Sequence, residues 1–536
     1  MALAAPAHAQ QGPIVQAPVG AVEGVADGPL NVFKGIPYAQ APTGQGRWAP
    51  PTPVQAWQGV RKATAFGPIC VQPKLPGGGG LSDAPAKMSE DCLSLNIWAP
   101  SDARGAPVLV WIHGGSLWAG AGSEAIYDGA KLAKRGLVVV TINYRLGVLG
   151  YLAHPDLSAE SPLGISGNYG LLDQITALAW VQRNITAFGG DPANVTIAGQ
   201  SAGGLSVLYL MASPVSRGLF AKAIAESAYM ISTPELKQAK YGQPAAEAAG
   251  AALAAGLGGQ SLANLRAMDA LNLTNAAAYL GFAPFAAVDG KVLPRQLVDT
   301  FDAGEQAPVP VLTGFNSGEI RSLKFLAPKA PANAAAYESE IRKRYGDLAD
   351  AFMALYPSTN MDESILATSR DAIYGWTAER LAIKQTALGQ PAYAYLFDHG
   401  YPAVDKAGFH GFHASEIPYV FGTADHLPSY WPKPPATPEE DTFSGAMAGY
   451  WASFARTGKP EAAGEPQWPL FGQAHAYMAF EAQPVPSNNL MSSAYALDEE
   501  VVCRRHAKGG IPWNWNVGLA SPPIPAKLAA CTGGQP

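Results

Sequence analysis

The chain has 536 residues, of which 48% are hydrophobic and 15% are charged, and its formal net charge is −6. No apolar run is long enough to cross a bilayer, and like charges do not gather in long blocks, so the composition argues against a membrane span and against a nucleic-acid-binding surface. The composition is that of a globular enzyme, and small molecules are its expected partners.

The first residues are interpreted as the end of an export signal. Ala7-His8-Ala9 has the small-x-small form of a signal cleavage site, although the basic start and long apolar stretch of a complete signal are missing. A flexible alanine-rich terminus is the alternative. We therefore expect residues 1–9 to be a signal remnant, residues 10–536 to form a single domain, and the protein to be periplasmic or extracellular.

Four cysteines support this expectation. Cys70 and Cys92 flank one loop, and Cys503 and Cys531 flank the last segment, so two sequence-local disulfides would use all four. The spacing leaves other pairings open. Closing the first loop would stabilise the fold by about 3 kcal/mol in the chain-entropy model, and such bridges are typical of an oxidising compartment.

Short apolar segments alternate with longer helical patterns along the chain. β-branched runs at 108–112, 138–142 and 195–198 predict buried strands, and 173–184 predicts a helix between two of them. This alternation is typical of an α/β fold with a mostly parallel central sheet and helices on both faces. Further strands are predicted at 219–225, 309–313 and 392–397, Ala-rich helices at about 244–269, and surface loops at 77–80 and 427–441.

The strand at 108–112 runs directly into the segment His-Gly-Gly-Ser-Leu-Trp at 113–118. Glycines after a strand free consecutive backbone N–H groups to point at one spot, where they can hold an oxyanion. The N–H groups of Gly115, Ser116 and Ala202 are predicted to form a three-donor oxyanion hole. A plain glycine-rich turn is the alternative.

The most informative segment is Gly-Gln-Ser-Ala-Gly at 199–203, between the strand at 195–198 and a helix-like stretch. A serine on a sharp strand-to-helix turn, with small residues two positions away on each side, is typical of a nucleophile elbow. Gly199 and Gly203 are the small residues, and Ser201 is the predicted nucleophile. A serine hydroxyl also needs a base, an acid that orients the base, and oxyanion donors.

Several motifs together resemble the type-B carboxylesterase and cholinesterase family of α/β-hydrolases. They are Gly-Ile-Pro-Tyr-Ala at 35–39, Ser-Glu-Asp-Cys-Leu at 89–93, Trp-Ile-His-Gly-Gly at 111–115, Asn-Tyr-Arg at 143–145, Phe-Gly-Gly-Asp-Pro at 188–192, Gly-Gln-Ser-Ala-Gly-Gly at 199–204 and Phe-Ala-Arg-Thr-Gly at 454–458. The resemblance implies the α/β-hydrolase fold, a serine carboxylic-ester hydrolase without a cofactor, and a catalytic triad in the chain order Ser, Glu, His.

The resemblance selects Glu319 as the acid. This residue follows the strand at 309–313, in a segment similar to the one that carries the acid in the family. The family usually has an acidic residue before this glutamate and a glycine after it, whereas here Gly318 precedes it and Ile320 follows. Placed past a strand end, Glu319 is expected to hold the Nδ1–H of the catalytic imidazole.

Two histidines, His410 and His413, lie before a Glu-Ile-Pro-Tyr-Val-Phe-Gly run. In the family the catalytic histidine lies three residues before this glutamate, which selects His413 as the base and leaves His410 as a loop or pocket residue. No third ligand cluster accompanies the two histidines, so no metal site is expected. Ser227 matches a family serine that supports the acid and base by hydrogen bonding, with an ordinary buried hydroxyl as the alternative.

Weaker patterns concern the substrate. Phe282 and Phe285 resemble the wall of the family's acyl pocket, and Trp118 follows the oxyanion loop closely enough to line the same space, although aromatic residues there are equally typical of a core. A solvated surface arginine is the favoured interpretation of Arg321. The competing hypothesis is that it presents a positive charge to an acidic acyl group, as in esters of polycarboxylic acids cleaved by bacterial fumonisin esterases of this family.

One absence narrows the substrate class. No Phe, Tyr or Trp occurs between Cys70 and Cys92, where cholinesterases carry a tryptophan that binds a quaternary ammonium group. Choline esters are therefore not the expected substrates. An amidase or lipase with the same chemistry, or a non-catalytic adhesion or binding domain, are the alternative interpretations of the whole chain.

Overall fold

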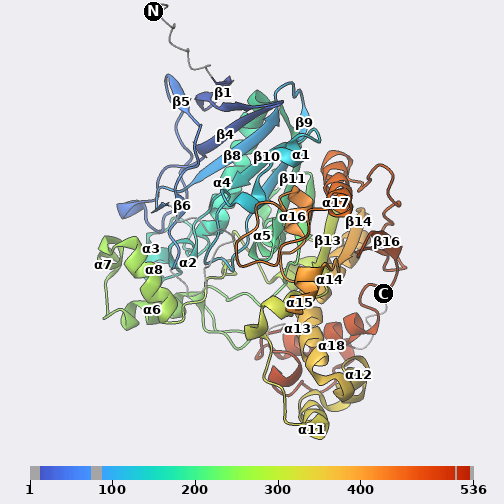
Figure 1. The fold of residues 1–536 in the computed structure, drawn as a ribbon. Coiled ribbons are helices and arrows are strands. Elements are labelled where there is room, and N and C mark those ends of the chain that lie inside the picture. The colour runs from blue at the N-terminus through green and yellow to red at the C-terminus, as the bar shows by residue number, and fades with distance from the viewer. Residues whose placement is uncertain (1–11, 74–86, 514–515, 532–536) are drawn as a thin grey trace, which may run out of the picture.

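The computed structural model describes residues 12–73, 87–513 and 516–531, and in this part of the chain 11 strands form one central sheet (Figure 1). Neighbouring strands from β10 to β15 run parallel, and the outer strands on both sides are antiparallel. In spatial order the strands are β16 (Pro484–Ser487), β15 (Tyr477–Phe480), β14 (Ala392–Phe397), β13 (Val311–Asn316), β12 (Lys222–Glu226), β11 (Gly190–Gln200), β9 (Ala106–Ile112), β10 (Val138–Ile142), β8 (Ser94–Pro100), β4 (Leu30–Pro37) and β3 (Val25–Asp27).

Helices cover both faces of this sheet, as predicted. In β9, Val108, Val110 and Ile112 belong to one hydrophobic cluster, whereas Leu109 and Trp111 belong to another, because successive side chains of a strand point to opposite faces. The first cluster includes side chains of α4 (Tyr169–Asn184), α5 (Ala202–Ala212) and α14 (Trp376–Ala387). The second includes side chains of α1 (Ala130–Ala133), α16 (Ile417–Phe421) and α17 (Pro438–Thr457).

Two groups of helices lie away from the sheet. Figure 1 shows α6, α7 and α8 together near α2 and α3, and α11, α12, α13 and α18 together at the opposite lower side. The bounds of the remaining helices are α2 (Gly147–Tyr151), α3 (Pro155–Glu160), α6 (Ala246–Gly256), α7 (Leu262–Ala267), α8 (Ala270–Tyr279), α9 (Leu297–Asp302), α10 (Glu319–Ser322), α11 (Ala334–Tyr345), α12 (Ala349–Leu355), α13 (Met361–Arg370), α15 (Pro402–Ala407) and α18 (Ser493–Lys508).

Some predicted boundaries were wrong for local reasons. The predicted strand at 219–225 begins later, at Lys222, because Gly218 turns with φ 77° and the N–H of Leu219 donates to Ser216 O. The Ala-rich region at about 244–269 is broken into two helices at Gly258 and Gly259, which both have positive φ. Glycine adopts this conformation without a steric cost, so the helix ends there.

The predicted loop at 427–441 ends four residues early. Helix α17 begins at Pro438, since the side chain of Thr437 accepts a hydrogen bond from the N–H of Glu440 and proline fits the first turn. The acidic residues that suggested a solvated loop are Glu439, Glu440 and Asp441, which lie in the first turn of α17. Negative charge is favourable there because of the helix dipole.

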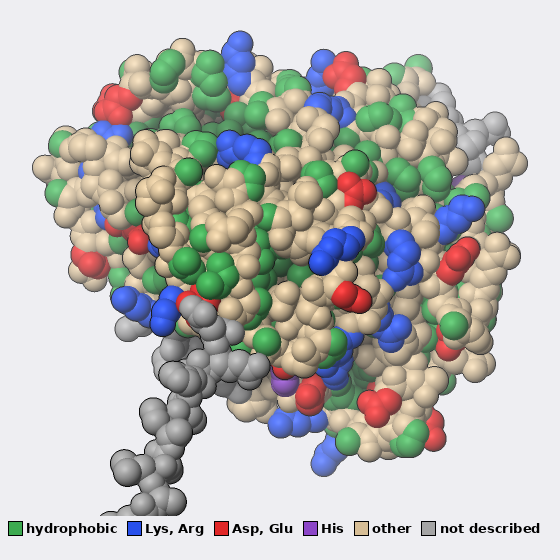
Figure 2. Space-filling view, turned by 90° about the horizontal axis from the view of Figure 1, so that it is seen from above, with side chains coloured by type: hydrophobic (Ala, Val, Ile, Leu, Met, Phe, Trp, Pro, Cys, Tyr) green, Lys and Arg blue, Asp and Glu red, His purple; other side chains and the backbone are tan. Residues whose placement is uncertain are grey.

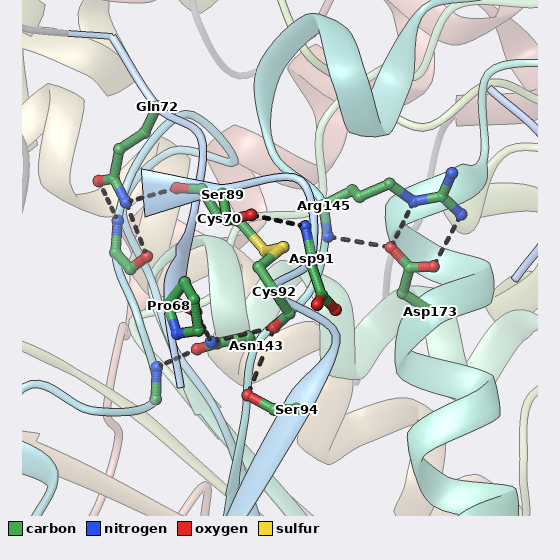
Figure 3. The surroundings of a disulfide bond; sticks show 12 residues. Pro68, Cys70, Gln72, Ser89, Asp91, Cys92, Ser94, Asn143, Arg145 and Asp173 are labelled. Carbon is green, nitrogen blue, oxygen red and sulfur yellow. Dashed lines mark hydrogen bonds and ion pairs between the residues drawn. A yellow bond between two sulfur atoms is a disulfide. The ribbon is translucent and has the colours of Figure 1, made fainter. Parts of the chain in front are cut away.

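Both predicted disulfides are formed, Cys70–Cys92 and Cys503–Cys531. Figure 3 shows how the first is tied to the sheet by Asn143, whose amide donates to the carbonyls of Pro68 and Cys92, both at 3.2 Å. The Oδ1 atom of Asn143 accepts a hydrogen bond from Gly122 N at 2.9 Å. Asn143 therefore connects the disulfide-closed loop with the segment that follows the predicted oxyanion loop.

Arg145, the last residue of the Asn-Tyr-Arg motif at 143–145, forms a buried ion pair with Asp173. Arg145 donates through Nε and Nη2 to the two carboxylate oxygens of Asp173 on α4, each at 2.8 Å (Figure 3). Both side chains are buried, at 4% and 0% exposure. Two parallel hydrogen bonds and full mutual neutralisation are what a buried ion pair requires to be tolerated.

Other predictions concern parts that bear less on the site. Residues 1–9 and 77–80 lie outside the described residues. Among the residues described, no helix combines the length and the apolar character that a membrane crossing requires. On the face drawn in Figure 2, basic and acidic side chains are interspersed over the surface.

The elbow glycine at 203 gives a test of the packing. Gly203→Ala is expected to destabilise the protein by about 3 kcal/mol, because a Cβ there would overlap the carbonyl oxygen of Ile112. The matched control is Gly445→Ala inside α17, where the nearest atom to a Cβ is 3.7 Å away. This control should gain about 0.5–1 kcal/mol. Urea-unfolding midpoints measure both, and similar midpoints for the two variants would contradict the close contact.

Candidate active site

Ser201 occupies a sharp turn between β11 and α5. Its backbone has φ 58° and ψ −121°, a conformation that non-glycine residues rarely adopt. The turn is held by Ser201 N, which donates to Glu226 O at 3.0 Å, and by Ser201 O, which accepts from Leu205 N at 2.9 Å. These bonds hold the strained residue at the carboxyl end of the sheet, where open α/β sheets bind ligands.

The two flanking glycines have a direct steric explanation. A Cβ at Gly199 would lie 2.6 Å from the backbone of Gly203 and 2.8 Å from Ile112 O. A Cβ at Gly203 would overlap Ile112 O itself. Strand β11, helix α5 and the end of β9 thus meet at backbone distance, which is the packing that a nucleophile elbow requires.

The predicted oxyanion loop follows β9 and lies against this elbow. Gly115 has φ 101°, and a Cβ there would overlap Ala119 O, so only glycine fits. Ser116 and Leu117 also have positive φ, at 56° and 59°. Gly115 and Ser116 line the same cavity as Ser201, and Ala202 is the first residue of α5, where backbone N–H groups lack helical acceptors.

His113 at the start of this loop has a structural role that the sequence did not predict. It is fully buried, stacks on Tyr144 at 4.4 Å between ring centroids, and its Nδ1 lies 2.9 Å from Gly114 O. Burial outweighs the hydrogen bond to Gly114 O and lowers the pKa of His113 to about 4, so the ring is neutral. Tyr144 in turn donates to His113 O at 2.7 Å.

Glu319 and His413 are hydrogen-bonded to each other. His413 Nδ1 contacts Glu319 Oε2, and Glu319 Oε1 accepts from the N–H of Asn316 at 2.9 Å. Glu319 is completely buried at the start of α10, three residues after β13 ends. Both of its oxygens are therefore occupied, and the carboxylate is fixed relative to the sheet.

The environment of His413 favours its protonated form. Burial alone would lower its pKa, but the charge of Glu319 and the hydrogen bond to it, with a smaller effect of Glu416, raise the pKa above its ordinary value. The other nitrogen, Nε2, is within hydrogen-bond distance of Gln200 Nε2, at 3.4 Å, and Gln200 is the residue before Ser201. The imidazole therefore faces the Ser201 turn with one nitrogen and the carboxylate with the other.

A π-helical turn places an aromatic ring beside this histidine. Residues Asp371–Gly375 form the turn between α13 and α14, and the ring of Tyr374 lies 5.3 Å from that of His413. Inserted π turns are often found at functional sites. Tyr374 was not predicted, because nothing in its sequence neighbourhood marks a one-residue insertion in a helix.

These residues surround a cavity of about 230 Å³. It contains the predicted Ser201, His413, Gly115 and Ser116. Lining residues that were not predicted are Gln200, Glu124 and Tyr127 on the polar side and Tyr229, Leu323, Phe325, Leu326 and Tyr374 on the apolar side. Leu323, Phe325 and Leu326 follow Glu319 within a few residues, so their apolar character could have identified them as cavity-lining residues.

Arg321 lies outside the cavity that contains Ser201, which disagrees with the hypothesis that it faces the substrate. Its guanidinium pairs with Glu363 of α13 and donates to Gly408 O, and it borders a separate hollow that also contains His410. A charged partner on the neighbouring helix neutralises it there. The surface-arginine interpretation therefore holds, and His410 is a residue of this second hollow.

Three other predicted residues lie elsewhere than expected. Phe282 and Phe285 line a different cavity, of about 570 Å³, against α6, and Trp118 packs edge to face on Phe282 at 6.1 Å between ring centroids. They form a neighbouring apolar wall rather than the lining of the cavity that contains Ser201.

Ser227 is buried, but its hydroxyl has no hydrogen-bond partner among the described residues, so the predicted bond to the acid is not formed. Both oxygens of Glu319 are already engaged.

No metal-binding arrangement accompanies the histidines. Within the ranges that the structure describes, no group of three or more His, Cys, Asp or Glu side chains is placed to hold a metal ion. The chemistry that this arrangement can perform is nucleophilic attack by a hydroxyl, with an imidazole to accept its proton and backbone N–H groups to hold an oxyanion.

The sequence matches the profile of the carboxylesterase family over residues 11–497. The chain belongs to this family. It is 37% identical to the fumonisin B1 esterase of Sphingopyxis macrogoltabida over 87% of this chain and 85% of that protein. It is also 37% identical to the para-nitrobenzyl esterase of Bacillus subtilis (strain 168), over 85% of this chain and 92% of the relative.

Solved structures agree with this assignment. A para-nitrobenzyl esterase structure superposes with a TM-score of 0.77 at 34% identity, covering 90% of this chain and 99% of that one. A carboxylesterase of Geobacillus stearothermophilus gives the same score, identity and coverage. The predicted α/β-hydrolase fold is thus confirmed, and the protein is a carboxylic ester hydrolase.

The Glu319–His413 pair predicts the pH dependence of ester hydrolysis. A general base must be neutral, and the pKa of His413 is raised, so kcat/KM should increase with pH around a midpoint above about 6.5, the ordinary histidine value. Glu319→Gln removes the charge that raises the pKa. Burial then dominates, so the midpoint should fall below about 6.5, and kcat should drop roughly ten-thousand-fold.

Glu363→Gln is the control for this pH profile. It removes a carboxylate that pairs with Arg321 outside the cavity, so its profile should match the wild type. A Glu319→Gln variant with an unshifted midpoint would contradict the assignment of the titrating group to His413.

Proposed function

We propose that Ser201, His413 and Glu319 are the catalytic triad of this ester hydrolase. The supporting observation is that the Glu319–His413 hydrogen bond and the strained Ser201 turn meet in one cavity. In the first step His413 Nε2 takes the hydroxyl proton as Ser201 Oγ attacks the ester carbonyl. The proton then passes to the departing alcohol as the acyl-enzyme forms.

The second half of the proposed reaction reverses these roles. Water loses a proton to His413 and attacks the acyl group on Ser201, and the proton returns to Ser201 Oγ as the acid is released. Glu319 orients the imidazole and stabilises it while it is charged. No cofactor takes part in this scheme.

The proposed oxyanion hole consists of the N–H groups of Gly115, Ser116 and Ala202. Their support is the backbone of the loop, which turns through three consecutive residues of positive φ next to the serine. Backbone donors of this kind are fixed before the reaction and act where water is excluded. Removing one such donor costs about 3 kcal/mol of transition-state stabilisation in enzymes of this chemistry.

We further propose uncharged esters with an apolar group as the substrates. Among the described residues that line the cavity, the side chains with a charge or a titrating imidazole are Glu124 and His413, and no lysine or arginine is present. Leu323, Phe325 and Leu326 form an apolar wall at the mouth, with Phe325 79% exposed. An anionic substrate would find no lysine or arginine side chain to replace its lost hydration.

Esters of polycarboxylic acids are the alternative substrates. The similarity to a fumonisin B1 esterase favours them, whereas the position of Arg321 outside the cavity disfavours them. A neutral aromatic ester, as the name of the para-nitrobenzyl esterase relative suggests, agrees better with the apolar wall.

We also propose that the enzyme is exported and that residues 10–536 form one catalytic unit. Two disulfides support an oxidising compartment, because reducing compartments rarely maintain them. The continuous sheet, whose strands extend from β3 to β16, supports a single unit.

A fluorophosphonate probe tests the proposed nucleophile. The wild-type enzyme should incorporate one equivalent on Ser201, located by peptide mass spectrometry, and lose its ester hydrolysis in parallel. Ser201→Ala should bind no probe. The control is Ser206→Ala on α5, which should still be labelled, because the Ser206 hydroxyl is engaged in a hydrogen bond to Ala202 O. Labelling at another residue, or none in folded protein, would refute the proposed triad.

Two p-nitrophenyl esters of similar acyl length, one neutral and one anionic, test the proposed substrate class. The p-nitrophenyl ester of butyric acid should be hydrolysed with a kcat/KM roughly tenfold or more above that of the p-nitrophenyl hemiester of succinic acid. Phe325→Lys places a cation at the mouth and should narrow this ratio. Arg321→Ala should leave the ratio unchanged, and a selective loss on the anionic ester in this variant would restore the polycarboxylate alternative.

A further inference from the structure

Two more buried glutamates lie behind the proposed triad, and the reaction scheme does not use them. Glu226 is the last residue of β12, and Glu416 directly precedes α16. Both are 0% exposed. The backbone of Glu226 already holds the elbow, since its carbonyl accepts from Ser201 N at 3.0 Å.

Each carboxyl has one donor and one unsatisfied oxygen. Glu226 Oε1 accepts from the indole N–H of Trp451 at 2.6 Å, and Glu416 Oε2 accepts from the amide of Asn316 at 2.5 Å. The other oxygens, Glu226 Oε2 and Glu416 Oε1, are buried and have no hydrogen-bond partner among the described residues. Buried polar atoms of native proteins are normally satisfied, so two such oxygens in one cluster require an explanation.

Among the described residues, no lysine or arginine is a main influence on the pKa of either glutamate. The titratable groups that act on the pair are Glu319 on α10, His413, Tyr395 on β14 and the phenol of Tyr127. Burial raises the pKa of both tyrosines, so they are neutral. Glu319 is acidic, which leaves His413 as the single basic group, and it is already paired with Glu319.

Asn316 connects this cluster to the acid of the proposed triad. Its backbone N–H donates to Glu319 Oε1 at 2.9 Å, while its side-chain amide donates to Glu416 and, at 2.8 Å, to Phe412 O. Phe412 is the residue before His413. Asn316 therefore connects Glu416 both to Glu319 and to the residue that precedes His413.

We propose that Glu226 and Glu416 share a single proton, with Glu226 as the donor, and that the one negative charge left on the pair helps to set the pH at which His413 becomes a base. A shared proton satisfies both free oxygens at once. Glu226 and Glu416 are thus positioning residues for His413, and the second part of the proposal rests on the proposed catalytic role of that histidine.

Electrostatics favours one proton over none or two. Two carboxylates in one dry site repel each other, so pairs of this kind titrate in two separate steps. Burial, with the charge of Glu416, raises the pKa of Glu226 well above its ordinary value, and burial with the charge of Glu319 raises that of Glu416 to about 7. Of the two, Glu416 is bonded to Asn316, which also holds the residue before His413, so the negative charge is best placed on Glu416 and the proton on Glu226.

Infrared spectroscopy tests the proton without using activity. The wild-type enzyme at neutral pH should show a carbonyl stretch of a protonated carboxyl group that disappears in Glu226→Gln. Asp498→Asn removes another buried carboxyl, on α18, whose pKa burial also raises, so a band lost in that variant belongs to Asp498 and the band lost in Glu226→Gln should remain there. An unchanged carbonyl band in Glu226→Gln would overturn the proposal, because Glu226 would then be ionised.

The pH profile of kcat/KM tests the influence on His413. Glu226→Gln keeps a neutral donor and should leave the acidic limb in place. Glu226→Leu removes the donor, so Glu416 takes up a proton and the pair loses its negative charge. The acidic limb should then move to lower pH by about one unit. Glu416→Gln removes the same charge and should move the limb in the same direction. An acidic limb that stays in place in Glu226→Gln but moves in Glu226→Leu shows that Glu226 acts as a proton donor and not only through packing.

Three outcomes of the profiles would overturn the proposal. A shift in Glu226→Gln equal to that in Glu226→Leu would mean that Glu226 is charged. Unshifted limbs in Glu226→Leu and Glu416→Gln would mean that the pair does not influence His413, and so would a shift in Asp498→Asn of the same size. Failure of the proposed triad is recognised separately, because Ser201 would then escape the fluorophosphonate probe while the infrared band remained.

Discussion

The contact between α5 and the carbonyl oxygen of Ile112 is the constraint on which the rest of the site depends. Because Gly203 has no side chain, the first turn of the helix rests on the end of β9 at backbone distance. The strand that ends there continues into the oxyanion loop. One close contact therefore fixes Ser201 and the proposed oxyanion donors relative to each other, and it does so through backbone atoms that have no rotamers to lose.

Strain at Ser201 is tolerated because the surrounding structure allows no alternative. The residue is held by Glu226 O on one side and by the first turn of α5 on the other. Unusual backbone conformations cost about 1–3 kcal/mol and persist only where neighbouring contacts over-determine them. A large sheet with cores on both faces supplies these contacts, and the hydroxyl is consequently presented to the cavity before a substrate arrives.

The acidic side of the site follows a different principle, in which each buried charge has a defined partner. Arg145 and Asp173 neutralise each other completely, and Glu319 is held by His413 and by Asn316 N. Glu226 and Glu416 depart from this pattern, since the main influences on Glu226 among the described residues are burial, the charge of Glu416 and the Trp451 hydrogen bond, none of them basic. That departure is what distinguishes them from the other buried acids near the sheet.

The sequence predicted the parts of the site that depend on short segments. The elbow, the oxyanion loop and the strand ends are determined by glycines and β-branched runs within a few residues, so their positions were readable. The pairing of Arg321 with Glu363 was not predictable, because Glu363 is 42 residues away and on another helix. The lining by Tyr229 and Tyr374, and the free hydroxyl of Ser227, likewise depend on packing between distant segments, which local patterns do not encode.

The π turn at Asp371–Gly375 has a consequence for how specificity can diverge in this family. Each residue of an α-helix advances the side-chain direction by about 100°. The extra residue in this turn therefore decides which side chain of the following stretch faces the imidazole, here Tyr374. Loss of a single residue would rotate a different side chain into the cavity in one evolutionary step, while the serine, the glutamate and the histidine, which lie on other elements, would keep their places.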